Sequence, residues 1–280
     1  MSKTMKKKQL AQELFADNIE LFRCPLCHQG FLPDTSSGLC CPNSHHFDLA
    51  RNGYLNLLIT QQNADYDRGL FQARREVFAE GIFDPLIAKL STLIAGLGLA
   101  DATVLDSGCG EGSLLVRLGK TLDWATLLGV DISRDGIRLA GAHNAAIMWC
   151  VADLAQLPLA NNSIGLVLNM LSPANYGEFK RILKPGGYLI KIVPGAYYLQ
   201  EIRARLGDVP AYSNEGVLAN LEENADIDSR VRLQYEVTLR PQLWSSVVKM
   251  TPLTEHRAVV GEPARQLTID LEIVCGVLAR

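Results

Sequence analysis

One stretch, residues 104–112, constrains the fold of this chain more than any other. Its sequence, Val-Leu-Asp-Ser-Gly-Cys-Gly-Glu-Gly, is an apolar run that ends in Asp106 and continues into three alternating glycines. The pattern predicts a buried strand and a tight loop, because glycine has no Cβ and its backbone can take positive φ and approach a ligand closely. A helix predicted over residues 113–118 would offer free N–H groups at its N-terminus. We therefore expect an α/β protein with a ligand site at this corner.

The spacing of the glycines narrows the class of ligand. Gly108, Gly110 and Gly112 stand two residues apart, whereas a dinucleotide loop places its third glycine one residue later and a Walker loop continues into Gly-Lys-Ser/Thr. A second apolar segment, residues 127–130, ends in Asp131 about 20 residues after the loop, where a carboxylate can hold ribose hydroxyls. This pattern fits an adenosyl group. It resembles the first two motifs of the class I S-adenosylmethionine-dependent methyltransferases.

Two further stretches fit the same resemblance. Asp153 ends a third apolar segment and is followed by Leu154, at the place where the resemblance implies a carboxylate that reads the adenine amino group. Residues 183–192 indicate a helix end, a Pro-Gly-Gly turn and a strand, which is typical of these domains after the fourth strand, expected over residues 164–170. The predicted fold class is α/β, with a class I Rossmann-like methyltransferase domain over residues 101–280 and a small N-terminal zinc-binding domain.

Composition excludes several classes of protein. A hydrophobic content of 48% and a charged content of 20% are ordinary for a globular protein, and a net charge of -3 gives no overall attraction to nucleic acid. No apolar run reaches the roughly 18 residues of a membrane span, and the N-terminal lysines precede an amphipathic stretch instead of a signal-peptide core. We therefore expect a cytoplasmic protein with no membrane contact. Residues 1–23 predict a short amphipathic helix, with a frayed extension as the alternative.

Cysteines and histidines between residues 24 and 46 have metal-ligand spacing. Two thiolates two residues apart form one knuckle of a tetrahedral site, and a thiolate and an imidazole form the other, which suits zinc. A thiol-reducing compartment favours a metal over a disulfide. The candidate ligands are Cys24, Cys27, Cys40 or Cys41, and His45 or His46. No open coordination position is evident, so the metal would be structural.

The remaining segments before residue 101 predict a ribbon, a linker and two helices. Residues 24–60 form the zinc ribbon, and the alternation over residues 47–58 predicts strands that close its small sheet. Residues 61–69 are polar and predict a linker, or a loop that orders over a substrate. Within residues 61–100 two helices would cap the donor site. Arg74 and Arg75, on the first of them, contact phosphates or form a solvated helix face.

The order of the motifs points to one family. Cys-Pro-Leu-Cys, Cys-Pro-x-x-His-x-Phe-Asp, Gly-Tyr-x-Asn-Leu-Leu, Gln-Ala-Arg-Arg, Asp-x-Gly-Cys-Gly-Glu-Gly and Met-Thr-Pro follow one another along residues 24–252. In this the chain resembles the 23S ribosomal RNA (guanine-N1)-methyltransferases, the RlmA family, over residues 24–280. The resemblance implies methylation of guanine N1 in a hairpin loop of 23S ribosomal RNA, with S-adenosylmethionine and zinc as cofactors and a homodimer as the assembly.

The resemblance also implies site residues. The zinc ligands would be Cys24, Cys27, Cys41 and His45. The methyl-donor contacts would be Phe83, Asp106, Gly108, Gly110, Glu111, Gly112, Asp131, Asp153, Leu154, Asn169 and Tyr198. Three positions depart from the family pattern: Ser107 replaces a branched aliphatic residue, Phe83 a tyrosine and Tyr198 a histidine. Stacking survives the two aromatic changes, whereas the polar contacts are put in doubt.

Residues 169–173 are the candidate target-facing loop, with Asn169, Ser172 and Pro173 at its centre and no residue named as the general base. Residues 199–232 predict a helical insertion that cradles RNA or forms a charged helix face. Residues 243–250 predict a helix, and residues 266–278 a final strand pair. Two other functions compete: a methyltransferase acting on another RNA or a small molecule, and a zinc-ribbon RNA-binding protein whose donor pocket has decayed.

Overall fold

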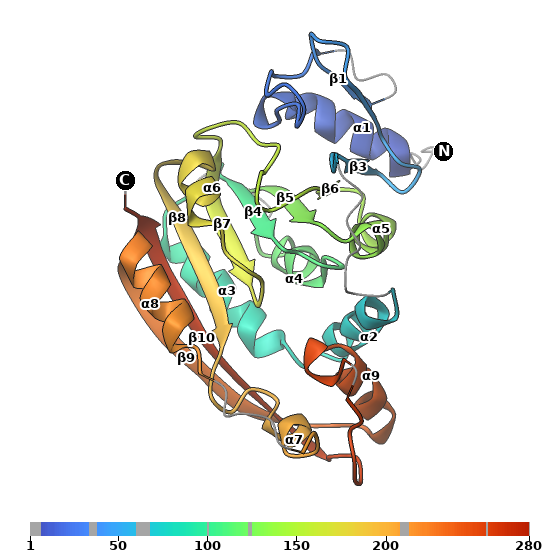
Figure 1. Cartoon of the computed structure of the whole chain (residues 1–280), viewed down its shortest axis with the longest axis vertical. Coiled ribbons are helices and arrows are strands. Elements are labelled where there is room, and N and C mark those ends of the chain that lie inside the picture. Colours follow the sequence, from blue (N-terminus) through green and yellow to red (C-terminus); the bar gives the residue numbers. More distant parts are fainter. Residues whose placement is uncertain are drawn as a thin grey trace.

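A computed structural model of the chain describes residues 7–33, 38–59, 68–99, 101–122, 125–207, 213–255 and 257–279. A twisted sheet carries helices on both faces, and a small N-terminal unit lies at one end of it (Figure 1). Residues 61–67 of the predicted linker lie outside the described residues. Its last two residues belong to helix α2 (Arg68–Ala79).

The sheet has the strand order β3-β6-β5-β4-β7-β8-β10-β9 among the described residues. Its strands are β3 (Tyr54–Asn56), β4 (Thr103–Ser107), β5 (Thr126–Asp131), β6 (Met148–Val151), β7 (Ile164–Met170), β8 (Leu183–Pro194), β9 (Ala225–Thr238) and β10 (Gln266–Leu278). Neighbours from β3 to β8 are parallel, and β10 is antiparallel to β8 and to β9. The winding reverses at β4, so the carboxyl end of β4 is a topological switch point, where such sheets bind ligands. The predicted class I fold is confirmed.

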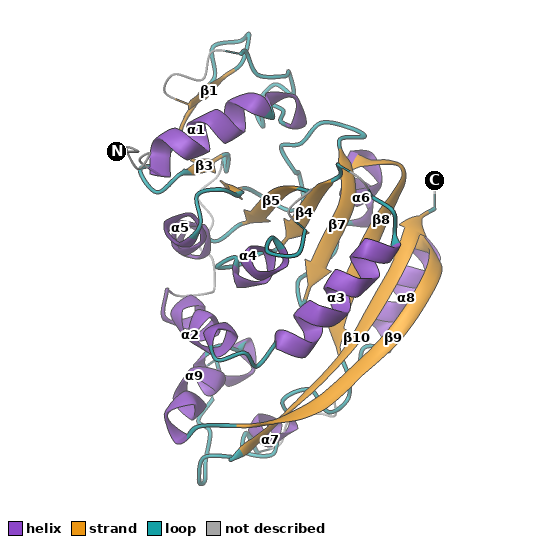
Figure 2. Cartoon of the chain, turned by 180° about the vertical axis from the view of Figure 1, so that it is seen from behind, coloured by secondary structure: helices purple, strands orange, loops and turns teal. Residues whose placement is uncertain are grey.

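Helices cover both faces because alternate strand residues point to opposite sides. Val104 belongs to one buried cluster and Leu105 to the other, and every residue of β4 is buried. The first face carries α2, α3 (Asp84–Gly96), α4 (Ser113–Leu118), α5 (Arg134–His143), α7 (Gln200–Arg203) and α9 (Trp244–Lys249). The second carries α1 (Lys7–Asp17), α6 (Tyr176–Ile182) and α8 (Glu215–Asn224). Figure 2 shows α3 lying along the sheet. None of the described helices is long and apolar enough to cross a bilayer.

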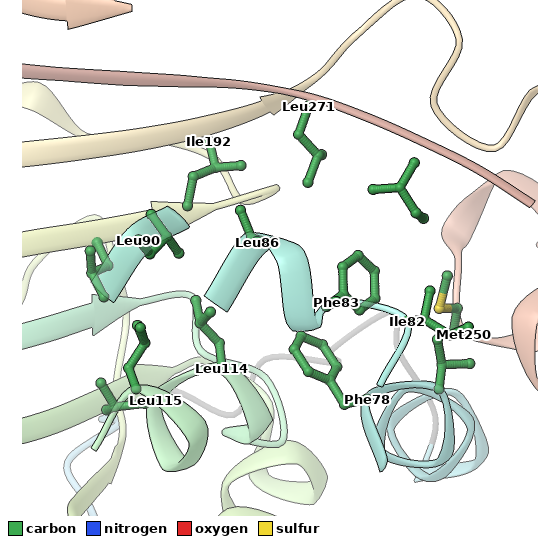
Figure 3. Packing of buried hydrophobic residues seen from close by; sticks show 14 of the residues in the cluster. Phe78, Ile82, Phe83, Leu86, Leu90, Leu114, Leu115, Ile192, Met250 and Leu271 are labelled. Carbon is green, nitrogen blue, oxygen red and sulfur yellow. The ribbon is translucent and has the colours of Figure 1, made fainter. Parts of the chain in front are cut away.

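The first buried cluster fixes the aromatic residues that matter for the site. Figure 3 shows Phe78 of α2 facing Phe83, which precedes α3, and their rings stack with centroids 4.6 Å apart. Leu86 and Leu90 of α3 are fully buried, and Ile192 of β8 belongs to the same cluster. The two predicted capping helices are therefore held on the sheet through one continuous apolar contact.

The N-terminal helix packs on the second face. Ala11 and Phe15 are its buried residues, and the Phe15 ring lies 5.4 Å from that of Phe22. The predicted helix is confirmed as α1, and the alternative of a frayed extension is wrong for the described residues. Strands β1 (Gly38–Cys40) and β2 (His46–Asp48) form a separate antiparallel pair.

Two predictions for strands need correction. Residues 47–58 do not close the small sheet as a whole: Leu49 and Leu55 share an isolated bridge, and β3 pairs in parallel with β6 of the main sheet. Buried Leu55 and Leu57 explain this, because they extend the apolar face of the large sheet. Residues 266–278 form one strand, β10, which pairs with β8 and β9 and not with a second strand of the same segment.

The predicted helical insertion over residues 199–232 is also wrong in its last part. Helices α7 and α8 are present, but β9 begins at Ala225 and carries Arg230 and Arg232. Apolar and polar residues alternate along β9, a period of two that belongs to a strand. Arg232 pairs with the buried carboxylate of Asp270 on β10, so it does not lie on a helix face.

Candidate functional site

The glycine loop between β4 and α4 is fixed against β5. The amides of Gly108 and Cys109 donate to the carbonyl of Val130 at 2.8 and 3.1 Å. Gly108 has φ +82°, and a Cβ there would lie 2.0 Å from Oγ of Ser172. Gly112 has φ +79°, and a Cβ there would lie 2.4 Å from the Trp149 ring. Both positions require glycine, because the conformation is strained for other residues and the space is filled.

Three carboxylates surround this loop, and burial raises the pKa of each. Asp106 is 1% exposed, and burial, followed by the charges of Asp131 and Glu111, raises its pKa to about 8. Burial is also the largest cause of the raised pKa of Glu111 and Asp131. Glu111 accepts from Oγ of Ser113 at 2.7 Å, and Asp131 accepts from the amide of Gly110 at 2.8 Å. The site therefore gathers acids whose charge would be favoured by a bound cation or hydrogen-bond donor.

Two buried oxygens at the end of β4 have no hydrogen-bond partner among the described residues. They are Oδ2 of Asp106 and Oγ of Ser107. Leaving a buried polar atom unpaired costs about 1–3 kcal/mol, and more when it is charged. Asp106 also lines a cavity, so its free oxygen can be satisfied by a ligand. Ser107 does not line it, so the hydroxyl that departs from the family pattern has no partner there.

A cavity of about 590 Å³ opens beside these acids. Small-molecule sites have volumes of about 300–1,000 Å³. The predicted site residues that line it are Phe83, Asp106, Gly108, Glu111, Asp131, Ser172, Pro173 and Tyr198. The structure thus brings both sides of the predicted site, the glycine loop and residues 169–173, to one space.

The other predicted donor contacts are not among the residues that line the cavity. They are Gly110, Gly112, Asp153, Leu154 and Asn169. Leu154 approaches the glycine loop, with Cδ1 3.7 Å from the position of a Cβ on Gly108. Asp153 follows β6 as expected, and its Oδ1 accepts from the amide of Ala155 at 2.8 Å. The donor contacts of these residues stay predictions.

Aromatic side chains also line the cavity. Phe71, Phe78 and Phe83 come from α2 and the turn after it, and Tyr198 from the segment before α7. Tyr198 is 7% exposed, and burial raises its pKa to about 12, so its hydroxyl is protonated at neutral pH. These side chains offer flat apolar surfaces to a ligand.

The paired arginines of α2 hold the site together. Arg75 donates to Oε2 of Glu111 at 3.4 Å and to the carbonyl of Leu139 at 2.6 Å. Arg74 lines the cavity and donates to the carbonyl of Met250 at 3.2 Å. The predicted solvated helix face is therefore wrong for both. Arg75 neutralises an acid of the glycine loop, a role that the sequence pattern alone did not indicate.

Sequence reasoning missed Lys191, which lies beneath the target-facing loop. It is 3% exposed, and burial lowers its pKa from 10.5 to about 8. Its Nζ donates to Oδ1 of Asn169 and to the carbonyl of Ser172. Asn169 is fully buried, and its Nδ2 donates to the carbonyls of Ser107 and Pro173 at 2.9 and 3.2 Å. A lysine inside the apolar run of residues 189–193 was the available signal.

Three thiols and one imidazole of the N-terminal unit come together at a second site, a candidate metal site. The ligand atoms of Cys24, Cys27, Cys41 and His45 all lie within 4.8 Å of one another. Sγ of Cys24 and Sγ of Cys41 are each 3.4 Å from Nδ1 of His45, and Sγ of Cys27 is 3.6 Å from that of Cys41. Ordinary zinc bond lengths in a tetrahedral site separate the ligand atoms by about 3.5–3.8 Å. The donor set and its geometry fit zinc.

The β1–β2 pair decides between the competing ligands. Cys40 and His46 stand opposite each other in the register of the two strands. Cys41 and His45 lie inside the turn, where the Cys41 amide donates to the His45 carbonyl at 3.1 Å. His46 instead contacts Asp48 at 3.1 Å. In the described part of the chain, Cys40 and His46 are therefore outside the metal-ligand cluster.

The donor pocket fits S-adenosylmethionine on its own chemistry. That molecule carries a sulfonium and an ammonium group, an adenine and ribose hydroxyls. The unpaired oxygen of Asp106 and the buried Asp131 provide acceptors, while Phe83 and Tyr198 provide flat apolar surfaces.

Comparison with known families agrees with this division of the chain. The N-terminal zinc ribbon described as RlmA, N-terminal, matches residues 22–64, and the methyltransferase domain family matches residues 104–187. Among solved structures, YcgJ of Bacillus subtilis aligns with a TM-score of 0.47 and 14% identity, covering 68% of this chain and 98% of that one.

Two relatives match over most of their length. YxjB of Bacillus subtilis carries the provisional name 23S rRNA (guanine-N(1)-)-methyltransferase. It is 38% identical to this chain, and the alignment covers 93% of this chain and 98% of YxjB. The 23S rRNA (guanine(748)-N(1))-methyltransferase of Streptomyces fradiae is 32% identical over 85% of this chain and 87% of its own. At 93% of this chain, the alignment with YxjB must reach both the ribbon and the methyltransferase domain.

Proposed function

This chain belongs to the family of the 23S rRNA (guanine-N1)-methyltransferases, and from that membership we propose that it transfers the methyl group of S-adenosylmethionine to N1 of a guanine in a hairpin loop of 23S ribosomal RNA. The observation that carries the proposal is one cavity bounded by two loops. Asp106 and the glycine loop line this cavity together with Ser172 and Pro173 of the target-facing loop.

The reaction requires the chain to align two ligands more than to supply chemistry of its own. S-Adenosylmethionine supplies an electrophilic methyl group on a positively charged sulfur. The backbone at Gly108, with Asp106 and Asp131, binds the donor, and Phe83 and Tyr198 offer flat apolar surfaces to it. A bond forms between guanine N1 and the methyl carbon as the carbon–sulfur bond breaks, and the N1 proton passes to water. Holding the reacting atoms in line lowers the barrier chiefly through orientation.

The metal centre has a structural role in this proposal. Cys24, Cys27, Cys41 and His45 would hold zinc with four protein ligands, which leaves no open position for catalysis. The two strands of the ribbon are three residues each and provide little core of their own, so metal binding would stabilise their fold. The ribbon would bind the phosphates of the RNA and recognise its shape, while contacts to unpaired bases would determine the sequence specificity.

The proposal extends to assembly and compartment. We expect a homodimer and a cytoplasmic location, close to the ribosomal RNA substrate. Light scattering coupled to size-exclusion chromatography, with and without an RNA fragment, measures the assembly directly.

Two rival functions make different predictions. A small-molecule methyltransferase would turn over without RNA, whereas the ribosomal enzyme binds RNA with a strong dependence on salt. A ribbon protein with a decayed donor pocket would not bind S-adenosylmethionine. The open cavity and the unpaired oxygen of Asp106 favour a working donor site over a decayed one.

The test is primer extension on 23S ribosomal RNA from strains with and without the gene. Methylation of N1 blocks base pairing, so a stop at one guanine should appear only when the gene is present. Gly108→Ala should abolish the stop, because its Cβ would collide with Ser172 and its φ is +82°. Gly96→Ala is the matched control: nothing lies within 4 Å of the added Cβ, and the stop should remain. Equal stops in all strains would contradict the proposal.

A further inference from the structure

Lys191 is a buried cation that no acid in the described part of the chain pairs with. It lies on β8 opposite Asn169 of β7, is 3% exposed, and its Nζ contacts the neutral oxygens of Asn169 and Ser172. Burying a charge without an ionic partner is costly, and an acceptor from a bound ligand would offset part of that cost.

The geometry leaves one donor for a ligand. A lysine ammonium has three N–H groups. Among the described residues, two of them are used by Oδ1 of Asn169 and the carbonyl of Ser172. Lys191 lines the same cavity as Ser172 and Pro173, the residues of the target-facing loop. The third N–H is therefore available to an acceptor that enters the cavity on the substrate side.

We propose that Lys191 recognises the target guanine by donating a hydrogen bond to its O6. The inference rests on the proposed function and names the residue that selects the base. Lysine donation to guanine O6 is a common specific contact in nucleic-acid recognition. Adenine carries an amino group at the same position, which the ammonium cannot donate to. The contact thus favours guanine over adenine.

The same contact assists the reaction. As N1 bonds to the methyl carbon and the carbon–sulfur bond breaks, the N1 proton passes to water and electron density moves between N1 and O6. Negative charge develops on O6 if the proton leaves first. A fixed ammonium at O6 stabilises that charge, and removing one such donor typically slows an enzyme about 10²–10³-fold.

The protonation state of Lys191 sets the pH range of this role. Burial lowers its pKa to about 8, so most of it is charged at pH 7, and the donor is lost as pH rises through that value. Titratable or charged groups on the elements around the cavity are Asp106 of β4, Cys109 and Glu111 of the glycine loop, Asp131 of β5, Tyr176 of α6, Tyr198, Arg203 of α7 and Arg74 of α2. Burial alone, and none of these groups, accounts for the lowered pKa.

The experiment measures single-turnover methylation of unmodified 23S ribosomal RNA transcript with labelled S-adenosylmethionine. Lys191→Met should slow the reaction about 100-fold or more, while Lys191→Arg, which keeps a charged donor, should stay within about tenfold of the wild type. Lys184→Met changes an exposed lysine of the same strand and should have no effect. The affinity for S-adenosylmethionine, measured by calorimetry, and the zinc content should be unchanged in all three variants.

A substrate change tests the contact without relying on a folded variant. A transcript made with 6-thioguanosine carries a poor acceptor at position 6, and the wild type should methylate it more slowly, although its N1 is more acidic. The rate advantage of the wild type over Lys191→Met should also shrink between pH 7 and pH 9, while that of Lys191→Arg should not.

The outcomes separate the two levels of inference. A wild type that methylates no guanine would overturn the proposed function and the Lys191 contact together. An active wild type matched by Lys191→Met would overturn the contact alone. Loss of S-adenosylmethionine binding in Lys191→Met would place the lysine in the donor site and also refute it. Equal loss in the Arg and Met variants, with a rate that rises with pH, would make Lys191 a base instead of a donor.

Discussion

Replacing Asp106 by asparagine should stabilise the ligand-free protein and weaken donor binding at the same time. Asp106 is fully enclosed at the end of β4, and burial, with the charges of Asp131 and Glu111, raises its pKa from 3.8 to about 8. Between these two values the folded state holds a proton that the unfolded chain has lost. The free energy of unfolding therefore falls as pH rises through this window.

The size of the expected change in stability follows from the raised pKa of Asp106. Each pH unit inside the window is worth about 1.36 kcal/mol, so this one carboxyl lowers the free energy of unfolding by about 3 kcal/mol between pH 5 and pH 7. Asparagine has the same shape and does not titrate. The difference between Asp106→Asn and the wild type should grow by about that amount over this range and level off above pH 8.

Denaturant unfolding from pH 5 to pH 9, with zinc kept present, measures the difference. Asp226→Asn, which changes an exposed carboxylate on β9 that does not line the cavity, is the matched control. Calorimetry should find S-adenosylmethionine binding weakened about 10- to 100-fold in Asp106→Asn, as expected for the loss of a charge-assisted contact. A stability difference independent of pH would refute the reasoning about burial, and unchanged donor affinity would refute the assignment of the free oxygen.

Two other substitutions test the site. Cys41→Ser should lose zinc and lower the melting temperature, whereas Cys40→Ser should keep the zinc and the melting temperature, because Cys41 belongs to the metal-ligand cluster and Cys40 does not. Metal analysis and thermal unfolding measure the two effects. Zinc loss from both variants alike would contradict the assignment. Arg75→Met should weaken S-adenosylmethionine binding by about tenfold in calorimetry, because Glu111 loses its nearest cation; an unchanged affinity would mean that the glycine loop does not depend on α2.

The part of the site that lies on single strands could be predicted from sequence. Asp106 and Asp131 each end an apolar run, and the carboxyl ends of parallel strands meet at one edge of a sheet. Local spacing therefore sufficed to bring both acids to one cavity. The zinc ligands could also be predicted from local spacing, except for the choices between Cys40 and Cys41 and between His45 and His46. Those choices depend on where two three-residue strands end and begin.

The contacts between elements could not be predicted in the same way. Lys191 meets Asn169 because β7 and β8 pair in one particular register, and Arg75 meets Glu111 because α2 packs over the glycine loop. Neither contact is indicated by a local sequence pattern. Strand β9 is a different case, since the alternation of apolar and polar residues over residues 225–238 is visible in the sequence and indicates a strand.

Under the proposed function, Asp106 and Lys191 would suit the cavity for two ligands instead of one. They carry opposite potential charges and line the same space, yet no ion pair joins them among the described residues. Burial moves both toward their neutral forms, raising the pKa of the acid and lowering that of the amine. A cationic methyl donor beside Asp106 and a base that becomes electron-rich beside Lys191 would restore both charges. The charges that are unfavourable in the empty protein are then the ones that the reacting pair requires.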